Sequence, residues 1–380
     1  MRGAPRGEGE PASRAGRISR GVIPFLCLGA AGCVLPARGP SGQAPPSTDN
    51  APAVGVPPLR SVAGAPHIGA AVEVRRLAEP KFAGVLAANF NSVTPENDMK
   101  WVNVEPSPGQ FSFRAGDALL AFAEQNGMRV RGHTLVWHQQ LAPWVAGLSG
   151  EALHAAMIRH VTSEVSHWKG KISQWDVVNE AFADGPGGGL RKDSPFTALG
   201  PTFIDDAFRA AHEADPAAQL FYNDYQLEDP GTAKTEAVYQ MARRLKAAGV
   251  PIGGVGFQMH VDARHWPAAA LIRQTMERFA ALGLAVEITE MDVPVGEVPG
   301  DLAQKLEQQR RLTHDIVAAC VAVAACSGVT FWGFTDRYSW LNAPQFARLF
   351  GRGPHHPLPF DGDYAAKPMA AGVAAAFAGN

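Results

Sequence analysis

Short runs of apolar residues recur along residues 60–380, and each has the length expected of a buried strand. Successive runs begin about 37 residues apart on average, which leaves room for a strand, a loop, a helix and a second loop. Eight such runs occur, at residues 67–71, 84–90, 129–136, 172–178, 219–222, 254–258, 285–288 and 329–334.

Segments with helical periodicity lie between these runs. Several of them place apolar residues at three- and four-residue spacing, with Gly or Asn just past the end, as amphipathic helices do. We predict helices at residues 116–125, 152–167, 203–214, 232–248, 268–282 and 302–325.

Strands that alternate with helices are typical of the α/β class. Eight such units close most economically into one (β/α)8 TIM barrel, and no second linker divides residues 59–380, so we predict a single barrel domain. An open, doubly wound sheet is the alternative. That alternative is disfavoured because no glycine-rich phosphate-binding turn follows the first predicted strand.

Composition and charge narrow the class of function. With 46% hydrophobic and 18% charged residues, the 380-residue chain is expected to fold around a core. No stretch reaches the roughly 18 uninterrupted apolar residues of a membrane-spanning helix. Residues 1–60 hold seven Arg and three acidic residues, which leaves a net charge of about −6 on the rest of the chain. A nucleic-acid partner is therefore not expected.

The N-terminal region has the order of a secretory signal over residues 1–36, with five Arg before residue 21 and an apolar run after it. Residues 30–33 (AAGC) resemble a bacterial lipobox, which makes Cys33 a candidate for lipidation; ordinary signal cleavage further on is the alternative. Residues 37–58 are rich in Pro, Gly, Ser and Ala and are expected to form a linker. We therefore expect an extracytoplasmic protein that is secreted, periplasmic or lipid-anchored.

Two predicted strands end in carboxylates. Asn179 and Glu180 follow the fourth run, and Glu290 follows the seventh. In a (β/α)8 barrel the carboxyl ends of the strands carry the active site, so both Glu side chains should meet there. Two carboxylates without a metal suit cleavage of a glycosidic bond, one as general acid/base and the other as nucleophile. A single Glu at such a position would more simply be a solvated loop residue.

The neighbouring predicted strand ends carry side chains that suit a sugar. Indole rings stack on pyranose faces, and amide, imidazole and ammonium groups bind hydroxyls. A metal-dependent hydrolase built on His133, His138, His260 and His265 is conceivable, but no HxH or HExxH spacing is present, so we expect no metal and no cofactor. The sugar-binding candidates at these strand ends are Lys100, His133, Trp137, His138, Asn223, Asp224, Gln258, His260, Trp332 and Trp340.

Seven sequence motifs in barrel order resemble those of the glycoside hydrolase family 10 endo-β-1,4-xylanases, over essentially all of residues 60–380. The motifs are NSVTPENDMKW (91–101), RGHTLVWH (131–138), WDVVNEA (175–181), YNDY (222–225), GFQMH (256–260), ITEMDV (288–293) and TFWGFTDRYSW (330–340).

The resemblance implies a retaining double displacement. Glu290 would be the nucleophile and Glu180 the acid/base, with their carboxylates about 5 to 5.5 Å apart. His260 would hold Glu290 ionised and pair with Asp292, and Asn179 would support the reaction at the sugar 2-hydroxyl. We also expect nearby negative charge and an apolar Trp wall to raise the pKa of Glu180.

The resemblance also implies which residues bind xylan and xylo-oligosaccharides, and we expect a monomer. Gln140 and Trp340 would crowd the space that a glucose hydroxymethyl group needs, which favours xylan over cellulose. Gln226 replaces the usual Asn, and residues 184–189 (DGPGGG, the lip) lie beside Glu180; both bear on the reducing side of the cut. The substrate-binding residues implied are Glu96, Asn97, Lys100, His133, Trp137, Gln140, Asn223, Gln258, Trp332 and Trp340.

A disulfide between Cys320 and Cys326 is implied by the same resemblance, and it would steady the turn that presents Trp332. Free buried cysteines are the alternative. Two other functions stay open: a β-1,4-glucanase or mixed xylanase-cellulase on the same barrel, and a surface sugar-binding lipoprotein without catalysis. The presence of both Glu180 and Glu290 favours an enzyme, since a binding protein needs neither.

Overall fold

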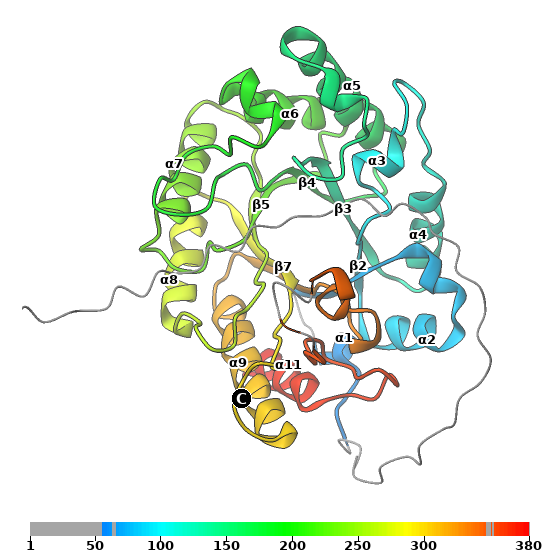
Figure 1. Ribbon diagram of the computed structural model, residues 1–380, viewed down its shortest axis with the longest axis vertical. Coiled ribbons are helices and arrows are strands. Elements are labelled where there is room, and N and C mark those ends of the chain that lie inside the picture. Colours follow the sequence, from blue (N-terminus) through cyan, green and yellow to red (C-terminus); the bar gives the residue numbers. More distant parts are fainter. Residues whose placement is uncertain (1–54, 63–65, 347–350, 352, 380) are drawn as a thin grey trace, which may run out of the picture.

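The computed structural model describes residues 55–62, 66–346, 351 and 353–379, and it confirms the predicted (β/α)8 barrel. Eight parallel strands pair in chain order, and β8 returns to pair with β1, which closes the sheet (Figure 1). The strands are β1 His67–Val72, β2 Ser92–Pro95, β3 Arg129–Val136, β4 Gln174–Asn179, β5 Gln219–Asp224, β6 Gly254–Phe257, β7 Ala285–Met291 and β8 Cys326–Phe331.

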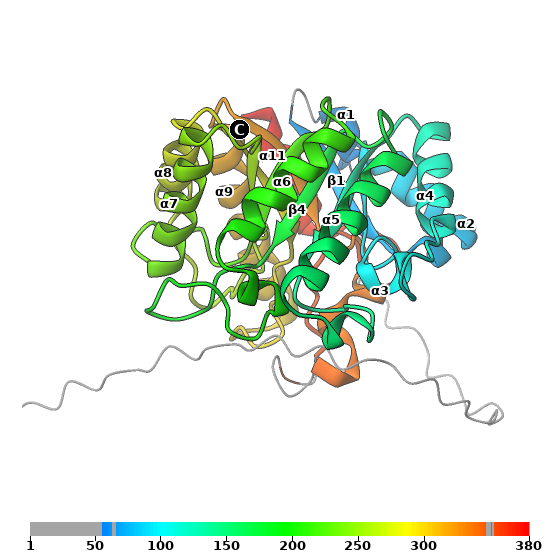
Figure 2. The same ribbon diagram turned by 90° about the horizontal axis from the view of Figure 1, so that it is seen from above.

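Helices surround the barrel in Figure 1. Each of the six predicted helices is present, as α4 to α9, and the prediction omitted α1, α2, α3 and α11. Figure 2 shows α1 and the end of α11 on one side of the barrel and the segment after β8 on the opposite side. The bounds are α1 Leu59–Val62, α2 Pro80–Asn89, α3 Trp101–Val104, α4 Arg114–Gln125, α5 Gly150–His167, α6 Thr202–Ala214, α7 Ala233–Ala247, α8 Ala269–Ala280, α9 Leu302–Val321 and α11 Pro368–Ala378.

The second predicted strand was wrong. Residues 84–90 lie in α2 and its C-cap, and the strand is the next segment, Ser92–Pro95. Helix α2 begins with a Pro in its first turn and buries Phe82 and Leu86, which stand four residues apart on one face. The strand SVTP is short and partly polar, but all four of its residues are buried by the barrel around it. Its sequence therefore carries little strand signal.

The barrel interior contains charged side chains. Arg131 of β3 is fully buried, and its guanidinium lies 2.5 Å from Asp176 of β4 and 3.1 Å from Glu287 of β7. Burial alone would raise the pKa of Glu287, but the charges of Arg131 and His67 lower it to about 2. Each of these three buried charges therefore has a partner of opposite sign, which offsets part of the cost of burying it.

The disulfide between Cys320 and Cys326 is confirmed, with a Cα separation of 5.6 Å. It joins the last turn of α9 to the first residue of β8. Trp332 follows the other end of β8, so the disulfide lies at the opposite end of this strand from the turn that presents Trp332. None of the helices in the described ranges combines the length and the hydropathy that crossing a bilayer requires.

Candidate active site

Glu180 and Glu290 stand at the carboxyl ends of β4 and β7, and both are nearly buried, with 4% and 5% of their surfaces exposed. Asn223 of β5 lies between them. Its amide nitrogen donates to Glu290 Oε1 at 2.7 Å and to Asn179 Oδ1 at 2.8 Å. Asn179 in turn donates to Glu180 Oε1 at 3.1 Å. A continuous chain of hydrogen bonds therefore joins the two carboxylates.

Three side-chain donors surround the Glu180 carboxylate. Gln258 Nε2 donates to Oε1 at 3.0 Å, and Trp137 Nε1 donates to Oε2 at 2.9 Å, in addition to Asn179. The backbone of Glu180 has a φ of +54°, a conformation that ordinary residues rarely adopt. Its N–H donates to the Asn223 carbonyl at 2.9 Å, which holds this strained turn in place.

The pKa of Glu180 lies below its ordinary value, so the expectation of a raised pKa was wrong for this structure. Burial does raise the pKa. The positive potential of His138 and the hydrogen bonds from Gln258 and Trp137 lower it further than burial raises it. These donors stabilise the carboxylate form, and the apolar faces of the Trp residues do not offset them.

Glu290 is bound on its other side by His260. The imidazole Nε2 lies 3.3 Å from Glu290 Oε2, and Nδ1 lies 3.0 Å from Asp292 Oδ2. Trp340 Nε1 also donates to Asp292, at 2.9 Å. Burial alone would lower the pKa of His260, but Asp292 and Glu290 raise it to about 10. His260 is therefore an imidazolium at neutral pH that donates to both carboxylates.

The other predicted sugar-binding residues lie around the ends of β2, β3 and β8. Lys100 Nζ lies 3.1 Å from Asn97 Oδ1 and 4.7 Å from the centroid of the Trp137 ring. Gln140 donates to the same Asn97 oxygen at 3.2 Å. Trp332 is close to this group, with its ring centroid 5.1 Å from that of His133 and 5.8 Å from Lys100 Nζ.

Glu96 follows β2 directly and lines a small hollow beside Glu73 and Tyr338. Burial and the charge of Glu73 raise its pKa to about 7. The structure thus brings Asn97, Lys100, Trp137, Gln140 and Trp332 together and places Glu96 at their edge.

The family model described as glycosyl hydrolase family 10 matches residues 59–376. This chain belongs to glycosyl hydrolase family 10. It is 40% identical over 306 residues to a β-1,4-xylanase of Dictyoglomus thermophilum, covering 77% of this chain and 83% of that protein. It is 41% identical over 292 residues to endo-1,4-beta-xylanase B of Thermotoga neapolitana, covering 76% and 81%.

Solved structures agree with the family assignment. Native xylanase 10B from Thermotoga maritima superposes with a TM-score of 0.79 at 39% identity, covering 84% of this chain and 98% of that one. Xylanase 10B from Thermotoga petrophila in complex with xylobiose also gives 0.79 at 39% identity, covering 84% and 97%.

Asp176 contributes to this family 10 site, and its role was not predicted from the sequence. Its Oδ2 lies 3.0 Å from His133 Nδ1, and it also binds Arg131, so it orients the His133 ring. A charged residue inside an otherwise apolar strand was the available signal, because a buried carboxylate needs a partner. The structure does not add support for a metal-dependent hydrolase. Across the ranges that the structure describes, no group of three or more His, Cys, Asp or Glu is arranged to hold a metal ion.

Proposed function

We propose that this protein is an endo-1,4-β-xylanase that cleaves xylan and xylo-oligosaccharides with retention of configuration. The observation that carries the proposal is the pair of nearly buried carboxylates, Glu180 and Glu290, which are joined through two Asn side chains and surrounded by different donors. The xylanase names of the relatives and the xylobiose complex of one solved neighbour support the choice of substrate.

In the proposed reaction, Glu290 attacks the anomeric carbon while the glycosidic oxygen leaves with a proton from Glu180. The His260 imidazolium donates to Glu290 and so holds its carboxylate in place for the attack. Water then hydrolyses the glycosyl-enzyme, and Glu180 accepts the proton of that water. The donors around Glu180 suit this second step, because they favour its carboxylate form. The first step needs a bound sugar to exclude water and so raise the pKa of Glu180.

The substrate-binding residues proposed for this chain are those implied by its family resemblance. Asn179 would hydrogen-bond the 2-hydroxyl of the sugar that is attacked. Residues from β2, β3 and β8 would bind the sugars on the non-reducing side of the cut. The full set of proposed substrate-binding residues, which also includes side chains of β5 and of the loop after β6, comprises Glu96, Asn97, Lys100, His133, Trp137, Gln140, Asn223, Gln258, Trp332 and Trp340.

Gln140 and Trp340 support a preference for xylan over β-1,4-glucan. Trp340 is fixed by its bond to Asp292 and by packing against Phe346, whose ring centroid is 5.1 Å away. Gln140 has a φ of +47° and is held by Asn97. Side chains held by such contacts would not move aside easily for the hydroxymethyl group of glucose. One clash of this kind gives only partial discrimination between xylan and β-1,4-glucan.

We further propose that the enzyme acts outside the cytoplasm, as a monomer. Residues 1–36 would be the signal and residues 37–58 the linker; the lipidation candidate Cys33 lies outside the described residues. The Cys320–Cys326 disulfide fits an oxidising compartment. Mass spectrometry of the mature N-terminus tests the anchor: an acylated Cys33 supports it, and an unmodified N-terminus beyond Cys33 removes it.

A side-by-side assay of the purified protein on xylan and carboxymethyl cellulose tests the substrate. We expect short xylo-oligosaccharides from xylan and weak release of reducing ends from the cellulose. Comparable rates on both polymers would favour the glucanase alternative. Binding to xylo-oligosaccharides without any hydrolysis would favour the sugar-binding alternative.

A further inference from the structure

The loops after β4 and β5 contain a second polar cluster, next to Glu180. The residues proposed to bind the non-reducing side of the substrate come from β2, β3 and β8. In the closed order of strands, β4 and β5 belong to the other half of the barrel. The departing sugar, which would receive a proton from Glu180, therefore meets the loops after β4 and β5. This step rests on the proposed function.

The lip, residues 184–189, is closed at its base like a hairpin. Phe182 and Leu190 form an antiparallel bridge, and Ala183 N donates to Gly189 O at 2.8 Å. Gly188 has a φ of +57°, and a Cβ at this position would lie 2.7 Å from the Ala233 carbonyl oxygen. Only Gly fits this approach, so the lip packs tightly on the start of α7.

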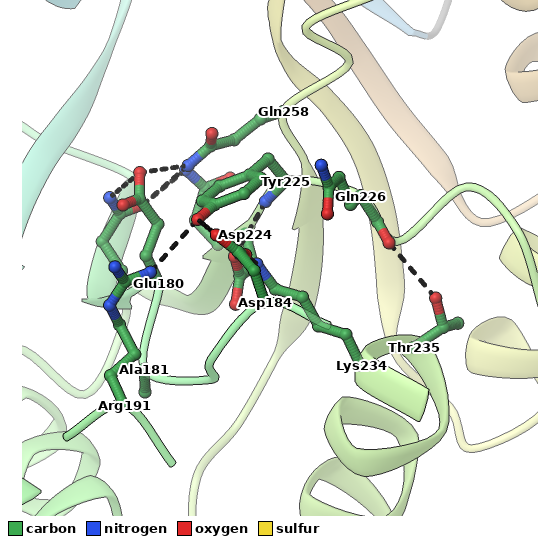
Figure 3. Close-up of polar contacts among 12 residues, drawn as sticks. Glu180, Ala181, Asp184, Arg191, Asp224, Tyr225, Gln226, Lys234, Thr235 and Gln258 are labelled. Atoms are coloured by element: carbon green, nitrogen blue, oxygen red, sulfur yellow. Dashed lines mark hydrogen bonds and ion pairs between the residues drawn. The ribbon is translucent and has the colours of Figure 1, made fainter. Parts of the chain in front are cut away.

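Asp184, the first residue of the lip, binds two side chains from other elements. Its Oδ2 accepts a hydrogen bond from the Tyr225 hydroxyl at 2.8 Å, and its Oδ1 lies 3.2 Å from Lys234 Nζ. Lys234 belongs to the first turn of α7, and its Nζ is 3.4 Å from the centroid of the Tyr225 ring. Both Tyr225 and Lys234 are only 3% exposed. Figure 3 shows Asp184 and Tyr225 pointing toward one another, with Lys234 reaching them from α7.

The cluster continues to the backbone next to Glu180. Lys234 Nζ also lies 2.8 Å from Asp224 Oδ1, and Asp224 Oδ2 accepts the Tyr222 hydroxyl at 2.5 Å. The Tyr222 oxygen accepts the N–H of Ala181, the residue after Glu180, at 3.0 Å.

Arg191 closes the cluster from the far side of the lip. Its Nη1 donates to the Tyr225 hydroxyl at 3.1 Å (Figure 3). Its backbone N–H donates to the Ala181 carbonyl at 2.9 Å. The Tyr225 hydroxyl is therefore fixed between a carboxylate and a guanidinium, with an ammonium group over the ring. Burial, followed by the charge of Glu180, raises the pKa of Tyr225 well above its ordinary value, which is consistent with a ring close to Glu180.

We propose that Asp184 is a positioning residue for the departing sugar, which acts by holding Tyr225, Lys234 and the lip in one arrangement beside Glu180. The side-chain bonds of Asp184 run to Tyr225 and Lys234, so its proposed effect on the reaction is indirect. Its carboxylate is the common partner of a hydroxyl from the loop after β5 and an ammonium from α7. Without it, the Tyr225 ring and the lip lose their shared anchor, and the surface offered to the departing sugar is no longer preorganised.

The test compares two substrates cleaved by the same preparation of full-length protein. Xylotetraose loses a sugar as its leaving group, whereas 2,4-dinitrophenyl β-xylobioside loses a phenolate. The ratio of kcat/KM for the two substrates does not depend on how much of the protein is folded. We expect Asp184→Ala to lower the ratio of xylotetraose to aryl glycoside about tenfold, mainly through KM for xylotetraose.

Two further variants separate positioning from folding. Asp184→Asn keeps an acceptor for the Tyr225 hydroxyl and loses the ion pair, so we expect an intermediate ratio even where Asp184→Ala folds poorly. Tyr225→Phe removes the hydroxyl and keeps the ring, and it should lower the ratio in the same direction. Lys192→Ala, at an exposed position on the same loop, is the control and should keep the wild-type ratio.

An unchanged ratio in Asp184→Ala, with a lower melting temperature, would show a purely structural ion-pair cluster and overturn the inference. An unchanged ratio in Tyr225→Phe would overturn the proposed route through the hydroxyl. A wild-type protein that cleaves neither substrate would overturn the proposed function, and the inference with it. That outcome is visible before any variant is compared.

Discussion

At the scale of single residues, the two candidate catalytic carboxylates differ in what surrounds them. Glu180 receives neutral donors from Asn179, Gln258 and Trp137, whereas Glu290 faces the His260 imidazolium. A charged donor stabilises a carboxylate more strongly than a neutral one. The two carboxylates therefore lie in different environments, as the different roles proposed for them require.

Replacing Glu180 should affect substrates according to their leaving groups. We expect Glu180→Ala to lower kcat/KM on xylan by about 10³-fold, because the departing sugar needs a proton. The loss on 2,4-dinitrophenyl β-xylobioside should be far smaller in the glycosylation step, since a dinitrophenolate leaves without one. Pre-steady-state release of the phenolate measures that step. Equal losses on both substrates would exclude Glu180 as the acid.

His260 predicts a pH dependence of stability. Its pKa is raised from 6.5 to about 10 in the folded state, so its ion pairs stabilise the fold fully below about pH 6.5. This contribution is lost as the pH rises through 10. We expect the difference in free energy of unfolding between wild type and His260→Gln to be largest near pH 6 and to shrink toward pH 10. Urea denaturation across this range measures it, and a difference independent of pH would contradict the raised pKa.

At the scale of elements, close packing between strands controls the site. A Cβ on Gly256 of β6 would lie 2.2 Å from Asn223 Oδ1, the side chain that joins the two carboxylates. A Cβ on Gly254 of the same strand would instead meet the Phe221 ring at 2.3 Å. The two glycines therefore make a matched pair, one at the site and one away from it.

We expect Gly254→Ala and Gly256→Ala both to lower the melting temperature. In either variant the added Cβ would push β6 away from β5, and the strands of a closed barrel cannot move apart freely. Gly256→Ala should in addition lower kcat per folded molecule by at least about tenfold, since it displaces Asn223. Active-site titration or the folded fraction by circular dichroism normalises the rates. Equal kcat values in the two variants would show that the position of Asn223 is not critical.

The disulfide should contribute to stability and not to catalysis. It closes a short loop of six residues at the end of β8 away from Trp332. We expect the double variant Cys320→Ser/Cys326→Ser to lose about 2 kcal/mol of unfolding free energy in the loop-entropy model. Its kcat on xylo-oligosaccharides should match that of wild type. A selective fall in kcat would mean that the α9–β8 turn does influence the barrel mouth.

The sequence alone allowed us to predict seven of the eight strands and the helices with clear amphipathic periodicity. It failed at Ser92–Pro95, where four partly polar residues are buried only because the barrel closes around them. The cluster of Asp184, Tyr225 and Lys234 was also not predictable. Its members come from three separate elements, and neither periodicity nor local motif spacing shows that Asp184 meets them.

At the scale of the whole molecule, the two ends of the described chain pack together. α11 packs on both α9 and α1, and a Cβ on Gly372 would lie 2.5 Å from the Arg310 carbonyl oxygen. Met369 and Val373 are fully buried in this contact region. Between the end of β8 at Phe331 and the start of α11 at Pro368 lie 36 residues. The barrel is thus stabilised by a helix that comes well after its last strand in the chain.

Truncations at the two ends should therefore differ. We expect removal of residues 1–54 to leave the melting temperature and the kcat on xylo-oligosaccharides unchanged. Removal of residues 368–380 should abolish cooperative unfolding, because it exposes the apolar surfaces of α9 and α1. Differential scanning calorimetry of the two truncated proteins measures both effects. A cooperative transition without α11 would contradict this account.

The measurement that tests the central claim most directly is azide rescue of two variants, with the configuration of the glycosyl azide read by proton NMR. In Glu290→Ala, azide occupies the place of the nucleophile and should give the α-azide from a β-aryl xylobioside. In Glu180→Ala, azide attacks the glycosyl-enzyme on Glu290 and should give the β-azide. The reverse pairing, or rescue with the same configuration in both variants, would contradict the roles proposed for Glu180 and Glu290.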